Sequence, residues 1–148
     1  MKRGLILTDI EDKAFIEAEK EGRSIKQLTA ENVRKFLREM GLLRMKIPDF
    51  LPRSSEHVEE MVKVIELLLD RKVAYWHKGN VYFDPLRFPG FGKLYGLDMS
   101  KWPERKVRYH RDTYPGTQWN LGDFILWHGY KKGYKTYWGT RIGRGRPS

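Results

Sequence analysis

The residues best equipped for chemistry are cationic and aromatic side chains near the C-terminus. Positions 101–148 hold eleven lysines and arginines against three acidic residues, so +8 of the net charge of +10 lies in the last third of the chain. Cations neutralise phosphates and flat rings stack on unpaired bases, so this segment favours RNA as a partner. Solvated lysines on a small basic protein explain the same charge equally well. The RNA-binding candidates are Lys131, Lys132, Lys135, Arg141, Arg144 and Arg146, with Trp119, Tyr130, Tyr134, Tyr137 and Trp138 as stacking candidates.

Other reactive residue types do not assemble a complete active site. The chain has no cysteine, which excludes disulfides, thiolate zinc sites and cysteine nucleophiles. Its four histidines are too widely spaced to place two ring nitrogens on one helical face around zinc, so no metal site is predicted. Ser54 and Ser55 are interpreted as helix caps, because neither a base nor an oxyanion hole is close in sequence.

Two further motifs have a structural explanation that competes with a functional one. The segment "GFGKLYG", from Gly90 to Gly96, departs from both the dinucleotide fingerprint and the P-loop, so it is interpreted as a structural turn. Asp9, Glu11 and Asp12 could hold Mg²⁺, but a helix start attracts carboxylates through its dipole without any metal. No catalytic residue is assigned from either motif.

The elements that must position these residues begin with two N-terminal helices. Thr8 and Glu11 have the spacing of a capping box, followed by a first helix of about ten residues. Ser24 and Gln27 repeat the start signal, and helical apolar spacing continues to Gly41, where a helix stop is expected.

A third helix is predicted after a proline-interrupted stretch. Pro48 and Pro52 cannot continue a helix, because they lack amide hydrogens and bias their neighbours toward extended geometry. Ser54 or Ser55 is then expected to cap the new helix. Its predicted buried stripe consists of Val58, Met61, Val62, Ile65, Leu68 and Leu69.

Strands are predicted beyond residue 72. Val73–Trp76 and Val81–Phe83 are two β-prone runs around Lys78, Gly79 and Asn80, which favour a tight reversal and so a β-hairpin. One more strand is expected from residue 123 to residue 127, and much of the remaining basic third is predicted to be loop. The fold class is therefore α+β, in one domain over residues 1–148. Leu5–Leu7 is too short for a signal peptide or membrane span, so the protein is expected in the cytoplasm.

Several ordered motifs resemble those of cysteinyl-tRNA synthetases. "TDIEDK" at Thr8–Lys13 resembles their Thr-Asp-(Val/Ile)-Asp-Asp-Lys motif, with Glu11 in place of the first Asp of the pair. "IPDFLPRSSEHVEEMVKVIELLLDRKVAYWHKGNVYFD" is similar to the helix and hairpin of the insertion (connective part) in their α/β catalytic domain. "FGKLYG", "GDFILWH" and "YWGTRIGRGRPS" resemble three further family segments, the last with extra residues after Gly139. The resemblance covers nearly the whole chain.

Four motifs that the family needs are missing from these residues: a cysteine before the His-Ile-Gly-His signature, that signature, a zinc-binding Trp-His-Ile-Glu-Cys segment and a Lys-Met-Ser-Lys-Ser loop. In the family, zinc recognises the cysteine thiolate and the signature loops hold ATP phosphates. The resemblance therefore implies that this chain alone is not an active ligase and binds none of the family's zinc, ATP or Mg²⁺. It also implies that Thr8 and Asp9 are a remnant of the substrate pocket, with no catalytic residue present.

Three functions remain open on this reading. The first is a catalytically incomplete synthetase-related protein that binds RNA, with a tRNA acceptor end as its target. The second is one piece of a split or interrupted synthetase, active only with complementary chains. The third is a protein-interaction domain or a decayed paralogue. Leu5–Leu7 resembles the end of a strand from the family's parallel sheet. This edge is therefore expected to pair with a partner chain, to form a homodimer or to be covered by a loop.

Overall fold

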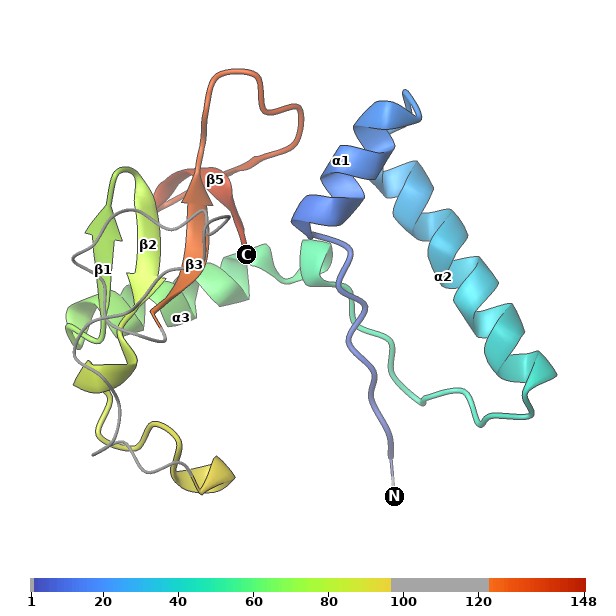
Figure 1. The fold of residues 1–148 in the computed structure, drawn as a ribbon, viewed down its shortest axis with the longest axis horizontal. Coiled ribbons are helices and arrows are strands. Elements are labelled where there is room, and N and C mark those ends of the chain that lie inside the picture. The colour runs from blue at the N-terminus through green and yellow to red at the C-terminus, as the bar shows by residue number, and fades with distance from the viewer. Residues whose placement is uncertain (1, 97–122) are drawn as a thin grey trace. The chain divides into compact units, whose positions relative to one another are not determined.

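The computed structural model describes residues 2–96 and 123–148, and within them three α-helices precede a five-stranded antiparallel sheet (Figure 1). The predicted α+β class is confirmed. The chain divides into two compact units, Met1–Val58 and Glu59–Ser148. That the two units act as one domain stays a prediction. No helix in the described residues has the length and apolar character needed to cross a membrane.

In the first unit, helix α1 (Asp12–Lys20) packs against helix α2 (Ile25–Leu42). The capping box predicted for α2 is confirmed, because the Ser24 hydroxyl accepts from the Gln27 amide while the Gln27 side chain accepts from the Ser24 amide. These paired bonds satisfy amide groups that the first helical turn leaves without partners. The buried apolar side chains of this unit are Ile10, Ala18, Leu28, Met40 and Val58.

The capping box predicted from Thr8 and Glu11 is wrong. Helix α1 begins at Asp12, its N-cap residue is Glu11, and no side chain bonds to the cap. Thr8 lies exposed, four residues before the first helical residue. The next residue explains the difference, because the carboxylate of Asp9 bonds to Ser55 and holds this stretch of chain outside the helix.

The N-terminal segment forms a short parallel pairing with residues 50–54 of its own chain, whereas the pairing with a partner chain or a second copy stays a prediction. Gly4 pairs with Phe50 and Leu7 pairs with Arg53 in isolated parallel bridges. The Leu5 amide donates to the Phe50 carbonyl at 3.0 Å. Leu7 contributes the rest of the pairing, since its amide donates to the carbonyl of residue 52 at 2.8 Å and its carbonyl accepts from residue 54 at 3.1 Å.

The serine cap predicted for the third helix is also wrong. Ser54–Glu56 forms a separate 3₁₀ turn, η1, and helix α3 starts only at Val58 and runs to Asp70. Ser55 donates both its amide and its hydroxyl to Asp9, so it is engaged elsewhere and cannot cap α3. The predicted apolar stripe is present: Val58, Val62 and Ile65 are buried, and Met61, Leu68 and Leu69 are half-buried.

The predicted β-hairpin is confirmed in the second unit. Strand β1 (Ala74–His77) pairs antiparallel with strand β2 (Asn80–Phe83). Lys78 and Gly79 connect them with φ angles of 47° and 80°. Positive φ at both central residues gives the turn a twist that matches the twist of the flanking strands.

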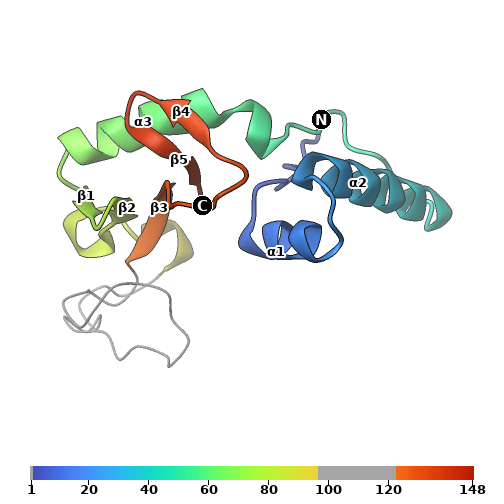
Figure 2. The same cartoon turned by 90° about the horizontal axis from the view of Figure 1, so that it is seen from above.

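The sheet continues through strands β3 (Phe124–Gly129), β4 (Trp138–Thr140) and β5 (Gly143–Pro147), in the order β1-β2-β3-β5-β4. The strand predicted from residue 123 to residue 127 is confirmed as β3. Figures 1 and 2 show α3 running across one face of this sheet. Trp127 and Val81 are fully buried and Tyr82 is nearly so, and together they form the centre of the core.

The prediction that the basic third is mainly loop is wrong for residues 138–147, because β5 inserts between β3 and β4. The glycines that suggest a loop make this strand possible. A Cβ atom on Gly145 would collide with the carbonyl oxygen of His128 and with the indole of Trp127. The bare backbone at Gly145 therefore lets β5 approach the most buried ring of the core.

The turn predicted for the "GFGKLYG" segment is confirmed. A 3₁₀ turn, η2 (Pro85–Arg87), follows β2, and a second, η3 (Lys93–Tyr95), lies between Gly92 and Gly96. Both glycines have positive φ, 76° and 72°, in the left-handed region that suits glycine.

Candidate nucleic-acid interface

Three tyrosines form a cluster on the loop that joins β3 to β4. We name residues 130–137 the tyrosine loop; it is the long orange-red excursion beyond β3 in Figure 1. The Tyr130 ring meets Tyr137 edge-on at a centroid distance of 4.7 Å and Tyr134 edge-on at 6.2 Å. Tyr130 and Tyr137 each remain 41% exposed. The cluster therefore fixes two rings against each other while leaving much of each accessible to a base.

Backbone hydrogen bonds hold the start of the loop and one turn inside it. The Tyr130 amide donates to the Arg144 carbonyl at 2.9 Å, which ties the start of the loop to β5. The Tyr134 amide donates to the Lys131 carbonyl at 3.1 Å across a turn in which Gly133 has a φ of 102°. Aromatic rings on a loop that is fixed by hydrogen bonds lose less conformational entropy on ligand binding than rings on a flexible segment.

Three lysines lie on the same loop as the rings. Lys131, Lys132 and Lys135 are exposed, and residues 130–137 contain no aspartate or glutamate. Arg144 is also exposed, and its guanidinium carbon lies 6.0 Å from the Tyr137 ring centroid, at the limit of a cation–π contact. The tyrosine loop and Arg144 thus contain seven of the eleven predicted RNA-binding residues: Lys131, Lys132, Lys135, Arg144, Tyr130, Tyr134 and Tyr137.

The other four candidates differ in their surroundings, and the structure describes three of them. Arg141 pairs with Glu66 of α3 at 2.7 Å, so much of its charge is compensated within the protein. Arg146 is only 6% exposed and donates from Nη1 to the Pro147 carbonyl at 3.1 Å, which places it below the surface. Trp138 is half-buried at the start of β4, and Trp119 lies outside the described residues.

The two residues assigned to a substrate-pocket remnant have different environments. Asp9 is 8% exposed, and its two carboxylate oxygens accept from the Ser55 amide at 2.9 Å and the Ser55 hydroxyl at 2.6 Å. Arg53 lies 3.8 Å from the same carboxylate. Asp9 therefore joins the N-terminal segment to the residues before α3, while Thr8 faces solvent.

A hydrogen bond between half-buried Tyr75 and buried Asp123, which sequence reasoning missed, positions the start of β3. The Tyr75 hydroxyl donates to Asp123 Oδ2 at 2.8 Å, and Asp123 is only 2% exposed. Burial raises the pKa of Tyr75 well above its usual range, and the hydrogen bond and charge of Asp123 raise it further. The phenol thus stays a neutral donor. No local signal could have revealed this pair, because its members lie 48 residues apart.

The zinc chemistry implied by the family resemblance does not fit this part of the chain. Cysteine is absent from all 148 residues, and in the described residues no three histidine, aspartate or glutamate side chains gather where they could hold an ion. Zinc selects thiolate and imidazole ligands in tetrahedral sets. No chemical step through zinc is therefore assigned to these side chains.

A family model and individual relatives agree on the proteins that this chain is similar to. A family model described as the tRNA synthetases class I (C) catalytic domain matches residues 5–148. The chain is 34% identical to a cysteine–tRNA ligase of Metallosphaera sedula and 36% identical to one of Solibacter usitatus; each match covers 95% of this chain and 29% of the ligase. A cysteine–tRNA ligase of Koribacter versatilis is 32% identical over 99% of this chain, again 29% of the ligase. The chain thus spans less than a third of the length of these relatives.

Proposed function

The chain belongs to the cysteinyl-tRNA synthetase family, and from that membership we propose that it binds RNA, with tRNA as the preferred ligand, and does not complete aminoacylation by itself. The observation that supports RNA binding is the tyrosine loop. It presents two partly exposed rings beside four exposed cations: Lys131, Lys132, Lys135 and Arg144.

This combination suits a single strand of RNA better than a duplex. Unpaired bases can leave the stack and lie on aromatic rings, whereas the bases of an RNA helix stay stacked and its deep major groove is closed to side chains. Each base stacked on a ring contributes about 1–3 kcal/mol, and lysines beside the rings neutralise the phosphates of the same strand. The unpaired acceptor end of a tRNA offers both groups together.

The proposed lack of independent ligase activity follows from the chemistry missing from these residues. Adenylate formation places negative charge on a triphosphate, which an enzyme must stabilise with donors fixed in advance. The family's signature loops and its cysteine ligands for zinc are absent from this sequence. The described residues therefore supply a surface for binding and no group that touches a reacting atom.

Two assays on the purified chain test these statements separately. In a gel-shift titration at low salt, tRNA should be retarded in a concentration-dependent manner, and unlabelled tRNA should compete. Cysteine-dependent exchange of pyrophosphate into ATP should be absent. Failure to shift tRNA at low salt would remove the binding proposal, and exchange activity in host-free material would remove the claim of incompleteness.

A second candidate function is one piece of a split or interrupted synthetase that is active only with complementary chains. The observation that favours it is the backbone edge at Ile6, which no other segment of the described residues covers. Leu5 and Leu7 bond toward residues 50–53, while Ile6 has no backbone hydrogen bond to the described residues and is 69% exposed. Parallel strands are normally buried on both faces, so this apolar edge suits a further strand from a partner chain or a second copy.

Mixing experiments distinguish this candidate from the first. If the chain is a piece of an enzyme, pyrophosphate exchange should arise when the family's zinc and signature-motif regions are supplied as a second polypeptide. An Ile6→Lys variant should then show no pyrophosphate exchange on mixing, because a lysine buried between the two polypeptides at this edge disfavours their pairing. No exchange after mixing, with a folded wild-type chain, counts against it.

A further inference from the structure

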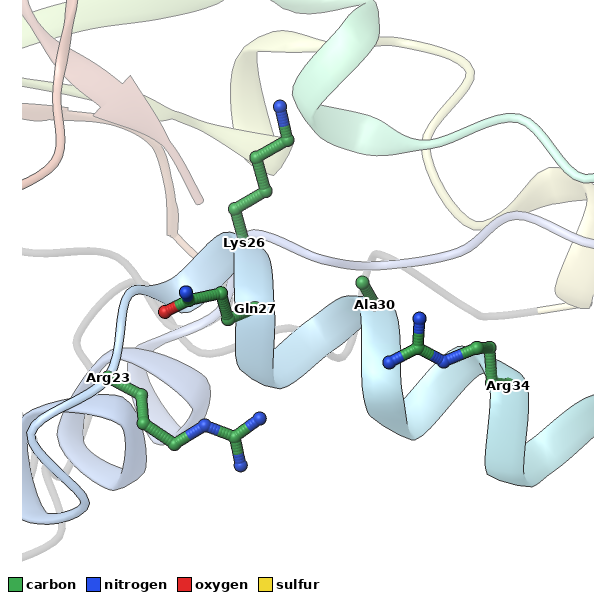
Figure 3. Close-up of a pocket in the computed structure, with 5 residues that line it drawn as sticks. All are labelled: Arg23, Lys26, Gln27, Ala30 and Arg34. Carbon is green, nitrogen blue, oxygen red and sulfur yellow. The ribbon is translucent and has the colours of Figure 1, made fainter.

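The first unit contains a basic hollow of about 490 Å³ on the flank of α2 that none of the sequence predictions included (Figure 3). It is lined by Arg23, Lys26, Gln27, Ala30 and Arg34, with no acidic lining residue. Figure 3 shows the guanidinium groups of Arg23 and Arg34 reaching toward each other from opposite ends, with Ala30 between them. Because the side chain of Ala30 is only a methyl group, it leaves an open space between the longer side chains that line the hollow.

The hollow is lined with hydrogen-bond donors. Gln27 Oε1 already accepts from the Ser24 amide, which turns the side-chain NH₂ of Gln27 toward a further acceptor. Lys26 and Arg34 form no hydrogen bond and no ion pair within 4 Å among the described residues. Two cations and one oriented amide therefore lack an acceptor at this surface.

Arg23 is paired with acidic groups of the protein itself, and the one on α2, Glu31, acts as an internal competitor for a ligand anion. Glu31 forms an ion pair with Arg23, which also pairs with Glu21 at 3.0 Å. The hydrogen bond from Arg23 and its charge lower the pKa of Glu31, with a smaller contribution from Arg34. In the free protein, Glu31 thus occupies one of the guanidinium groups that a ligand anion would use.

We propose that this hollow binds consecutive phosphates of an RNA strand. Lys26 and Arg34 are eight residues apart on one helix, so their backbones lie about 12 Å apart along its axis. That span suits a chain of phosphates better than one small anion. All lining residues come from α2 and the residue two before it, and none is aromatic, so the hollow has no ring for the base of a free nucleotide.

The first test compares the full-length chain with two variants of equal net charge. K26A/R34A removes two cations from the hollow, and K13A/K46A removes two exposed lysines of the same unit outside it. Binding of fluorescein-labelled oligouridylate is measured by anisotropy over a range of salt. Each phosphate contact to a single strand contributes about 0.7 to the slope of log affinity against log salt, so K26A/R34A should lower that slope by about 1.4. Equal slopes and affinities for the two variants would overturn the proposal.

A gain of binding provides the complementary test. E31Q removes the internal competitor and should raise the affinity for oligouridylate above that of E39Q, which loses the same charge about two turns further along α2. Equal affinities for E31Q and E39Q count against the proposal. Competition with ATP and with inorganic pyrophosphate identifies the source of the phosphate: saturable displacement of RNA by either one at equal concentration would show a small-anion site instead of an RNA track.

This proposal can fail independently of the tyrosine-loop proposal. Alanine at all three loop lysines leaves the hollow intact, so the effect of K26A/R34A should persist in that background. If the loop variant binds RNA normally while K26A/R34A does not, the hollow is supported and the proposed role of the loop is overturned.

Discussion

Tyr130 and Tyr137 meet edge to face across the tyrosine loop, with ring centroids 4.7 Å apart and ring planes inclined by 64°. This contact joins the two ends of a loop whose sequence alone suggests only a basic, aromatic stretch. It fixes the orientation of both rings while each stays 41% exposed. A buried aromatic pair would be simple core packing, whereas this pair remains available to a base.

Truncation of one ring should weaken RNA binding more than removal of its hydroxyl. Tyr130→Ala deletes a stacking surface and should cost about 1–3 kcal/mol of binding free energy for one base. Tyr130→Phe keeps the ring and should bind nearly as well as the wild type. Anisotropy titrations with oligouridylate measure both variants. Equal losses for alanine and phenylalanine would indicate that the hydroxyl, and not stacking, matters.

Alanine at Gly145 should destabilise the second unit. The added methyl group would collide with the His128 carbonyl and the Trp127 indole, and overpacking of this kind costs about 1–3 kcal/mol of unfolding free energy. Gly139→Ala is the matched control, because a Cβ atom there meets nothing within 4 Å. Urea denaturation followed by tryptophan fluorescence provides the comparison. A Gly145→Ala midpoint equal to that of Gly139→Ala would contradict the described approach of β5.

The Tyr75–Asp123 pair predicts a stability loss at alkaline pH. The pKa of Tyr75 is raised in the folded state, so the stabilisation is complete below the unfolded value of about 10 and declines as pH rises above it. Tyr75→Phe removes the hydroxyl and should cost about 1–3 kcal/mol at neutral pH, because a buried acceptor loses a donor. The free energy of unfolding of Tyr75→Phe should also decrease less than that of the wild type as the pH becomes alkaline. Urea midpoints at neutral and alkaline pH test both effects, and unchanged pH dependence in Tyr75→Phe would contradict this assignment.

The contacts between Asp9 and Ser55 should make their substitutions non-additive. Asp9→Ala removes both hydrogen bonds and Ser55→Ala removes the one from the hydroxyl, so the double variant should be less destabilised than the sum of the two single variants. Directly bonded residues typically show coupling energies of about 0.5–3 kcal/mol. A double-mutant cycle in urea measures it. Additive effects would mean that Asp9 does not join the N-terminal segment to the residues before α3.

Local signals in the sequence were sufficient for some of the elements. The capping box of Ser24 and Gln27, the apolar stripe of α3 and the turn at Lys78 and Gly79 all depend on neighbours within a few residues, and the structure has each of them. The erroneous cap at Thr8 has a long-range cause. Asp9 bonds to a serine 46 residues away, and that contact overrides the local preference for an earlier helix start.

The remaining features depend on contacts that no short window contains. Gly143–Pro147 has the composition of a loop, yet it is a strand because Gly145 packs on Trp127 of β3. For the candidate interface, composition located the lysines and tyrosines, but only the fold separates exposed Arg144 from buried Arg146. The α2 hollow is not visible in the net charge of each third of the chain, because it depends on the helical spacing that places Lys26 and Arg34 on either side of the small Ala30.

The most direct test of the central claim is the salt dependence of tRNA binding to the full-length chain. Alanine at the three lysines of the tyrosine loop is compared with alanine at Lys13, Lys46 and Lys63, three exposed lysines elsewhere that carry the same charge. The account predicts that the loop variant alone loses affinity and that its slope of log affinity against log salt falls by about 2, at about 0.7 per phosphate contact. If both variants keep the wild-type affinity and slope, the tyrosine loop is not the RNA-binding surface.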